Sequence, residues 1–312
     1  MAAVDAGRSL ADVPAFLEPF AMSDRTPPDW TRLPGLARGT WQYVHERTIA
    51  RRYHQFVADT PLCSLDVDYV IEHLGEPGIR RSQGAASHSG DATDKLSTDA
   101  TKQHWVLDLG AGNGRVAVPI AEKGYHVLAV DLSQPMLEEL IRQGTASRVL
   151  PLRANLVQMD GVRSSIADHA VCLFSTLGMI QGAEHRLRCL REARRIVRPG
   201  GSLILHVHWV GAALREPGGF RQLVSGAWKS LRRTNHEFGD STYAYRGLRE
   251  MYLHRFSLRE VRKLLRASGW KLRHVDWISE DGSEITRSRF RASGFFVVAE
   301  AALTVSVSMS GG

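Results

Sequence analysis

Cysteine is scarce in this chain, and its positions are far apart. Cys63, Cys172 and Cys189 are the only three in 312 residues, and no two stand at a Cys-x-x-Cys spacing. This pattern argues against a disulfide scaffold or a cysteine metal site, so no metal is predicted, and it suits a reducing compartment. Long apolar runs are also missing, since none approaches the ~20 residues that cross a bilayer. Residues 1–30 lack the apolar core of a signal peptide. We therefore expect a cytoplasmic protein with no membrane partner.

Acidic residues are fewer than basic ones. The chain has 33 Asp and Glu against 40 Lys and Arg, which gives a formal charge of +7 and a pI of about 9.6. The excess is concentrated in residues 228–273, where 12 Lys and Arg accompany 4 Asp and Glu. Such a segment can attract nucleic acid or an anionic substrate. We favour solvated helix faces, because no RNA-binding module is recognisable, so nucleic acid stays a possible but not a favoured partner.

A stretch from Trp105 to Ser133 predicts a strand, a glycine turn, a helix and a second strand. The apolar run Trp105–Leu109 is typical of a buried parallel strand. Three glycines follow within five residues; glycine tolerates positive φ and leaves no Cβ in the way of a ligand. Parallel sheets bind ligands at the carboxyl ends of their strands, beside helix N-termini. The stretch therefore predicts a ligand site at that edge.

Two acids flank the glycine turn and indicate what the ligand is. Asp108 precedes the turn, where it would repel a pyrophosphate and favour a cationic group, and Asp131 ends the second strand, where it can accept hydrogen bonds from a ribose diol. At this point the chain resembles the class I S-adenosylmethionine (SAM)-dependent methyltransferases, whose D-x-G-x-G-x-G motif matches Asp108, Gly110, Gly112 and Gly114. A glycine turn of another Rossmann-like domain, such as a nicotinamide-dependent reductase, is the alternative.

The resemblance implies an α/β fold with a Rossmann-like, seven-stranded, mostly parallel sheet, an antiparallel last strand, and helices on both faces. It also implies SAM as the cofactor. The expected cofactor residues lie around the aminoacyl group, the ribose, the adenine and the methyl group: Asp108, Gly110, Ala111, Gly112 and Gly114; Asp131 and Leu132; Asn155 and Leu156; Phe174 and Ser175. Asn155 stands where related families usually have an acid, and its amide oxygen can still accept from the adenine amine.

The remaining elements follow from periodicity and from helix signals. Ser133 is a predicted N-cap, and Ser257 with Glu260 forms a predicted capping box. Further strands are expected at 147–154, 171–175, 202–208, 270–278 and 295–301, and further helices from about 41, at 65–74, at 184–198 and at 258–268.

Composition divides the chain into five parts. We expect a flexible arm at 1–40, a helical lid at 41–75, a disordered linker at 76–103, a SAM-binding domain at 104–302 and a tail at 303–312. In the methyltransferases that the chain resembles, N-terminal helices often fold over the cofactor, and Tyr43, His45, Arg52 and Tyr53 would then face the site. An insertion at 210–253, after the fifth strand, is expected to cover the acceptor.

Candidate catalytic residues are His208, His254 and Tyr252, with His206 on the same strand face as His208. A histidine near its ordinary pKa of about 6.5 can take a proton from a nucleophile. The chain has 13 histidines, however, and most must be structural. Cys172 lies within a predicted strand and is interpreted as a core residue.

The favoured function is SAM-dependent methyl transfer to a small-molecule O, N or C nucleophile. The alternatives are an RNA methyltransferase, a non-catalytic SAM- or nucleotide-binding regulatory subunit, and a nicotinamide-dependent reductase. The sequence does not determine the acceptor or the oligomeric state.

Overall fold

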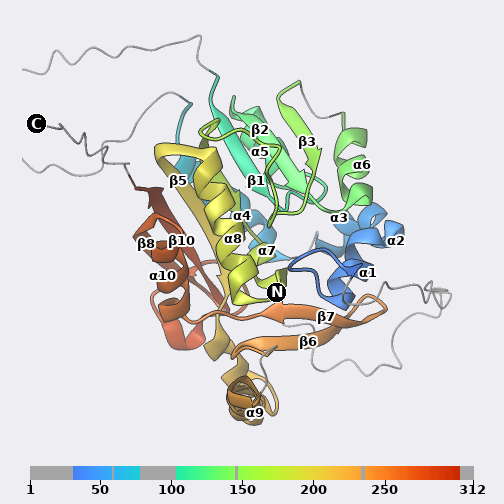
Figure 1. The fold of residues 1–312 in the computed structure, drawn as a ribbon, viewed down its shortest axis with the longest axis vertical. Helices are drawn as coiled ribbons and strands as arrows, with labels where there is room; N and C mark the ends of the chain where they lie inside the picture. The colour runs from blue at the N-terminus through green and yellow to red at the C-terminus, as the bar shows by residue number, and fades with distance from the viewer. Residues whose placement is uncertain (1–30, 58–59, 78–102, 145–146, 233–235, 303–312) are drawn as a thin grey trace, which may run out of the picture.

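The computed structural model describes residues 31–57, 60–77, 103–144, 147–232 and 236–302. An eight-stranded sheet forms the centre of this part of the chain, in the order β3-β2-β1-β4-β5-β10-β8-β9 (Figure 1). Strands β1 to β5 are mutually parallel, whereas β10 runs antiparallel to both β5 and β8. The strands are β1 (Trp105–Leu109), β2 (His126–Asp131), β3 (Val149–Arg153), β4 (Ala167–Cys172), β5 (Val197–His208), β8 (Trp270–Ile278), β9 (Ile285–Thr286) and β10 (Gly294–Ala301). The predicted Rossmann-like fold is confirmed, with the two-residue β9 added at one edge.

Helices cover both faces of the sheet because its central strands are apolar on both sides. Val106, Leu107 and Leu109 of β1 are fully buried. One hydrophobic cluster joins the sheet to α4 (Pro61–Leu74), α5 (Ala117–Glu122) and α6 (Gln134–Arg142). A second cluster joins the other face to α8 (Ala183–Ile196) and α10 (Leu258–Ala267). Two cores therefore hold the carboxyl edge of the sheet in place.

The predicted N-caps are present. Ser133 Oγ accepts the backbone N–H of Met136 at 3.4 Å, and Ser257 Oγ accepts that of Glu260 at 3.1 Å. Each cap satisfies a backbone donor that the first helical turn leaves unpaired. The first cap also fixes the chain directly after Asp131.

Strand β4 differs from the prediction at both ends. It begins at Ala167 because its polar residues have partners on neighbouring strands: Asp168 accepts the backbone N–H of Trp105 at 2.9 Å, and His169 contacts Ser202 Oγ at 2.7 Å. It ends at Cys172 because Phe174 and Ser175 adopt φ of 50° and 60°, which no strand accommodates. The short helix α7 (Thr176–Met179) follows at once.

The N-terminal region forms three short helices in place of the single one predicted from Trp41: α1 (Arg38–His45), α2 (Arg47–Arg51) and α3 (Tyr53–Val57). Glu46 is extended and breaks the helix, and its side chain caps α2 by accepting the N–H of Thr48 at 3.0 Å. Helix α1 begins at Arg38, three residues before the predicted start, so Thr40 lies inside it. Residues 31–40, which were assigned to the arm, belong to the folded part.

The insertion after β5 has regular structure. It contains the 3₁₀ helix η3 (Val210–Arg215), the helix α9 (Gly219–Arg232) and an antiparallel hairpin of β6 (Asp240–Tyr245) and β7 (Leu248–His254). The short η4 (Arg289–Arg291) comes later, before β10. The hairpin packs on α1 and α2 through a small core of Ile49, Ala50, Met136, Leu248 and Met251. N-terminal helices and hairpin thus form one cover beside the sheet (Figure 1).

The predicted tail and most of the predicted linker, residues 78–102, lie outside the described residues, as does the arm up to residue 30. Within the described ranges, every helix is too short or too polar to cross a bilayer.

Candidate active site

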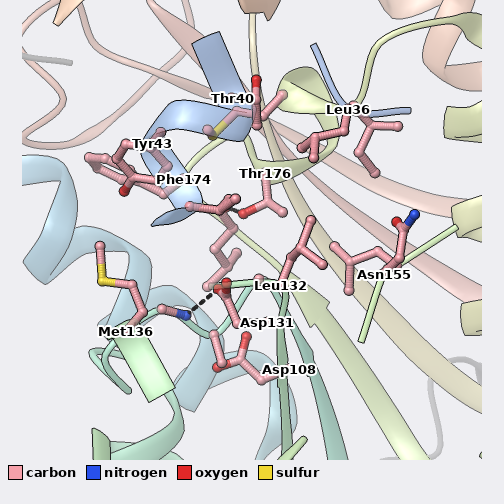
Figure 2. Close-up of a pocket in the computed structure, with 18 of the residues that line it drawn as sticks. Leu36, Thr40, Tyr43, Asp108, Asp131, Leu132, Met136, Asn155, Phe174 and Thr176 are labelled. Carbon is pink, nitrogen blue, oxygen red and sulfur yellow. Dashed lines mark hydrogen bonds between the residues drawn. The ribbon is translucent and has the colours of Figure 1, made fainter. Parts of the chain in front are cut away.

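A pocket opens where the carboxyl ends of β1, β2 and β4 meet the cover, and it includes about 1050 Å³ together with its open mouth. Figure 2 shows two acids, Asp108 and Asp131, at one end, and Thr40 and Tyr43 of α1 at the other. Nine predicted cofactor residues line it: Asp108, Gly110, Ala111, Gly112, Asp131, Leu132, Asn155, Leu156 and Phe174. The structure therefore has a pocket at the sheet edge where the sequence predicted a ligand site.

The glycine turn forms the floor of the pocket. Gly112 and Gly114 have φ of 56° and 87°, a region that side chains rarely adopt. A Cβ on Gly112 would meet no atom within 4 Å, whereas one on Gly114 would lie 2.2 Å from Leu140 Cδ1. Gly112 therefore leaves room on the pocket side. Gly114 does not line the pocket, and its hydrogen lets α6 approach the turn.

Asp131 is held by the backbone. It accepts the N–H of Gly112 at 2.8 Å and that of Ser133 at 2.7 Å. Burial raises the pKa of this carboxyl, and these N–H groups oppose the rise. A carboxylate has about four lone-pair positions, so the two oxygens can still accept hydrogen bonds from a ligand in the pocket.

Asp108 is a buried acid with an incomplete set of partners. It is 3% exposed, and its Oδ2 finds no hydrogen-bond partner among the described residues. Burial, with a smaller contribution from Asp131, raises the pKa of Asp108 to about 7, while the Arg115 guanidinium opposes the rise. A buried carboxyl in this state is stabilised by a nearby cation or hydrogen-bond donor. The pocket therefore favours a cationic group at this point.

Asn155 connects the pocket to the N-terminal segment. Its Nδ2 donates to the carbonyl of Pro34 at 3.0 Å, and its Oδ1 accepts the N–H of Val157 at 3.1 Å. Leu36 follows on that segment and pairs by a β-bridge with Ile180. Leu36, Leu132 after β2 and Leu156 after β3 also line the pocket and make an apolar slot, which suits a flat ring. Figure 2 labels Leu36 and Leu132 on the side of the pocket where Asn155 lies.

The far end of the pocket is aromatic. Phe174 has a left-handed φ of 50°, which carries an energetic cost that often marks a functional position. The guanidinium of Arg115 lies 5.1 Å from the centre of the Phe174 ring, and it donates to Asp66 and to the carbonyl of Cys63, both at 2.8 Å. Burial raises the pKa of the Tyr43 hydroxyl well above its ordinary value, so this hydroxyl stays protonated.

The predicted catalytic histidine of β5 does not line the pocket. His208 is half-buried, and its backbone N–H donates to Ser175 Oγ at 3.3 Å. Ser175, a predicted cofactor residue, is itself buried and does not line the pocket. Burial lowers the pKa of His208 to about 3, so its ring is neutral. The neighbouring His206 is fully buried, with Nδ1 3.6 Å from a carboxylate oxygen of Asp66.

His254 and Tyr252 are also placed away from the pocket, in a buried network of charges. His254 bonds to Asp240 at 2.7 Å and to Glu260 at 2.9 Å, and the Tyr252 hydroxyl donates to Asp240 at 2.6 Å. Burial disfavours the charged His254, but these carboxylates outweigh it and raise its pKa. Neither side chain lines the pocket, and both hydrogen-bond within this network.

Arg186 completes this network. Its fully buried guanidinium pairs with Glu237 and lies 3.6 Å from a Glu260 oxygen. Glu237, His254 and Glu260 place potential metal-ligand atoms within 4.8 Å of one another. The Arg186 guanidinium pairs with both of these carboxylates and His254 pairs with Glu260, so an ion-pair network accounts for the cluster.

Several lining residues were not among the predicted site residues. Of the four lid residues expected to face the site, Tyr43 and Tyr53 line the pocket, whereas His45 and Arg52 do not. Arg115, directly after the last glycine, and Met136, in the first turn after Ser133, could have been found from their neighbours. The others come from segments without a motif: Pro34, Gly35, Leu36, Thr40, Val44, Val116, Val157, Leu173, Thr176, Met179 and Ile180.

Comparison with known proteins decides the family. Residues 107–205, which include the glycine turn, both acids and Asn155, match a family described as "Methyltransferase domain". The chain contains a class I SAM-dependent methyltransferase domain. It is 25% identical over 179 residues to the malonyl-[acyl-carrier protein] O-methyltransferase of Hamiltonella defensa, covering 54% of this chain and 64% of that protein. It is 31% identical over 116 residues to mouse glycine N-methyltransferase, covering 33% and 39%. The chain thus spans less than two thirds of either curated relative.

A solved structure agrees in fold. The 1,6-didemethyltoxoflavin-N1-methyltransferase of Burkholderia thailandensis is 19% identical, with a TM-score of 0.52 over 87% of this chain and 93% of that one. Membership of the methyltransferases implies SAM as the cofactor. The pocket fits this group, because its unpartnered buried carboxyl at Asp108 calls for a cation and Gly112 leaves open space next to it.

Proposed function

We propose that this methyltransferase moves the methyl group of SAM to an oxygen, nitrogen or carbon of a small molecule. The observation that carries the proposal is the pocket itself. It joins a glycine floor flanked by two acids, Asp108 and Asp131, to an aromatic end under α1. When bound, SAM supplies a methyl group on a sulfonium, which is already activated toward displacement.

The acidic end would hold the cofactor. In this proposal Asp108 faces its cationic aminoacyl part, and Asp131 accepts hydrogen bonds from the ribose hydroxyls. The apolar slot of Leu36, Leu132 and Leu156 takes the adenine. Arg115 is the pocket's cation, and hydrogen bonds to described residues use only two of its five N–H groups. It is the group suited to the cofactor's carboxylate.

The aromatic end would hold the acceptor. Thr40, Tyr43, Tyr53, Phe174 and Met179 offer apolar surface with three hydroxyls, a lining typical of sites for small, partly apolar molecules. By their names, the two relatives methylate malonyl-[acyl-carrier protein] on oxygen and glycine on nitrogen. These names support a small acceptor group, free or carried on a protein, without fixing the methylated atom.

Alignment and exclusion of water are the main contributions that we assign to this chain. The protonated Tyr43 can orient an acceptor as a hydrogen-bond donor, and the Phe174 ring, beside the Arg115 guanidinium, offers an apolar surface against it. Displacement at a preactivated methyl group needs positioning and a preorganised field, and a base only when the nucleophile carries a proton. No role is proposed for His208, His254 or Tyr252 at the reacting atoms.

Binding and transfer test this proposal separately. Calorimetry is expected to show S-adenosylhomocysteine binding to the wild-type protein. Asp131→Ala should bind it about 10- to 100-fold more weakly, because hydrogen bonds to a charged group contribute roughly 1.5–3 kcal/mol. Asp131→Asn, which keeps the side-chain shape, is the matched control and should lie between the two.

Labelled methyl groups from SAM should then appear on a component of a small-molecule extract. A folded wild-type protein that binds neither SAM nor S-adenosylhomocysteine would refute the proposal. Binding without transfer to any acceptor favours a regulatory subunit, and transfer to RNA with steep salt dependence favours the nucleic-acid alternative.

A further inference from the structure

Helix α9 presents its large apolar side chains to solvent. Phe220, Val224, Trp228 and Leu231 are 69%, 55%, 57% and 83% exposed. Figure 1 shows α9 at the lower end of the molecule, away from the central sheet and beyond the β6–β7 hairpin. Within the described residues this is the longest run of exposed large apolar side chains on one element.

The spacing places these four residues on one side of the helix. Steps of four, four and three residues keep side chains in a single stripe. The opposite side faces the protein, because Gln222, Leu223 and Gly226 line a small cavity together with Val210 and Ala213. The helix therefore contacts the protein through Leu223 and Gly226 but turns four large apolar residues outward, unlike a helix that packs only on its own domain.

The charges of α9 are all positive. Arg221, Lys229 and Arg232 lie along one flank of the stripe, and the helix contains no acidic residue. The guanidinium of Arg232 stacks over the Trp228 ring at 3.4 Å from its centre. A stripe of Phe, Trp and Leu beside a cationic flank is the pattern of helices that lie in a membrane interface.

A second exposed aromatic residue lies on a segment attached to the same insertion. Phe290 of η4 is 72% exposed between the exposed Arg289 and Arg291. Arg215 of η3 donates to the carbonyls of Phe290 and Ala292 at 2.8 Å and 2.7 Å, which ties η4 to the segment that leads into α9. Two neighbouring elements thus combine exposed aromatic and basic side chains.

We propose that α9 is a peripheral docking surface for an anionic phospholipid membrane, with its apolar stripe among the headgroups and its cations on the phosphates. Charge complementarity selects this occupant. A second copy of α9 would bring three more cations against these three without an acid to neutralise them, whereas an anionic bilayer neutralises them all. Spanning is not required, so the absence of long apolar runs does not conflict with this surface.

Vesicle flotation tests the proposal. The wild-type protein is expected to bind phosphatidylcholine vesicles that contain phosphatidylglycerol much more tightly than vesicles of phosphatidylcholine alone, and added salt should weaken the binding. The double variant Trp228→Ser with Leu231→Ser should lose at least ten-fold in partitioning. Lys229→Gln and Arg232→Gln should each lose about five-fold on anionic vesicles.

Ile141→Ser is the matched control, because Ile141 is a single exposed apolar residue of α6, 58% exposed; its partitioning should not change. Binding of S-adenosylhomocysteine, which should be the same for all variants, shows that each remains folded and reports on the proposed function independently. Two results would overturn the membrane surface: vesicle binding that the double variant retains, or a wild-type dimer that ignores vesicles and that the double variant converts to a monomer.

Discussion

Two groups of ionisable side chains in this molecule differ in how completely they are paired and in how their pKa values are shifted. In the pocket, Asp108 and Asp131 lie side by side, and burial raises the pKa of both. In the network under the hairpin, His254 bridges two acids, and burial of Asp240 is outweighed by hydrogen bonds from His254 and Tyr252 that lower its pKa. We interpret the incompletely partnered acid as a group for a ligand, whereas the hydrogen bonds and ion pairs of the network join β6, β7, α8 and α10. Residue types alone do not separate these two cases.

The largest expected effect is on the paired network. His254→Leu removes the donor shared by Asp240 and Glu260 and should cost about 3 kcal/mol of unfolding free energy at neutral pH. The raised pKa makes the stabilisation complete below the unfolded value of 6.5, and it should fade as pH rises through the folded value. Urea unfolding at several pH values measures both.

Affinity for S-adenosylhomocysteine should stay within two-fold of the wild type in His254→Leu, and His254→Gln should be the milder variant. A loss of affinity without loss of stability would break the comparison, because it would assign His254 to the ligand site.

The pocket acid should behave in the opposite way. The pKa of Asp108 rises from 3.8 unfolded to about 7 folded, so the wild-type protein without ligand should lose stability between these pH values at up to about 1.4 kcal/mol per pH unit from this group. Asp108→Asn lacks this titration and should be the more stable protein at pH 7, yet bind S-adenosylhomocysteine more weakly. Urea unfolding at pH 5 and pH 7.5, with calorimetry, checks both; a destabilised variant would contradict the ligand role.

The smallest expected effect comes from replacing a glycine, and it separates backbone strain from contact with the ligand. Gly112 and Gly144 both have left-handed φ, 56° and 64°, and a Cβ on either meets no atom within 4 Å. Alanine should cost about 1 kcal/mol of stability at each position. Only Gly112→Ala should also weaken S-adenosylhomocysteine binding, since only Gly112 lines the pocket. Equal affinities of the two variants in calorimetry would place the ligand elsewhere.

The parts of the fold that the sequence predicted correctly depend on local signals. The bounds of β1 were predicted as observed, because an apolar run ends at a glycine turn. Ser133 and Ser257 cap their helices through residues three positions away. The backbone N–H of Glu260 bonds to the Ser257 cap as the predicted capping box requires. Its carboxylate, however, bonds to His254 and not to the cap residue. That partner is the last residue of β7, six residues before Glu260, and its position depends on how the strand and the helix fold against each other, which helix periodicity does not predict.

The parts that were missed depend on distant contacts. Asn155 and Pro34 are hydrogen-bonded although they are 121 residues apart in the chain. Nothing in the proline-rich N-terminal sequence predicts that this segment lines a pocket. The placement of the hairpin likewise depends on packing against α1 and α2. The end of the pocket with the glycines and the two acids was therefore predictable from a motif, whereas most of the aromatic end was visible only in the folded chain.

The bond between Asn155 and Pro34 has a consequence for ligand exchange. A molecule that fills the pocket contacts the sheet edge and also Leu36 and Tyr43 of the N-terminal segment. Its contacts with Leu36 and Tyr43 exist only while that segment is packed against the sheet edge. Occupancy and docking must then strengthen each other by the same factor. Saturation with S-adenosylhomocysteine would slow proteolytic cleavage around residues 34–44, and trimming that segment would shorten the residence time of the ligand.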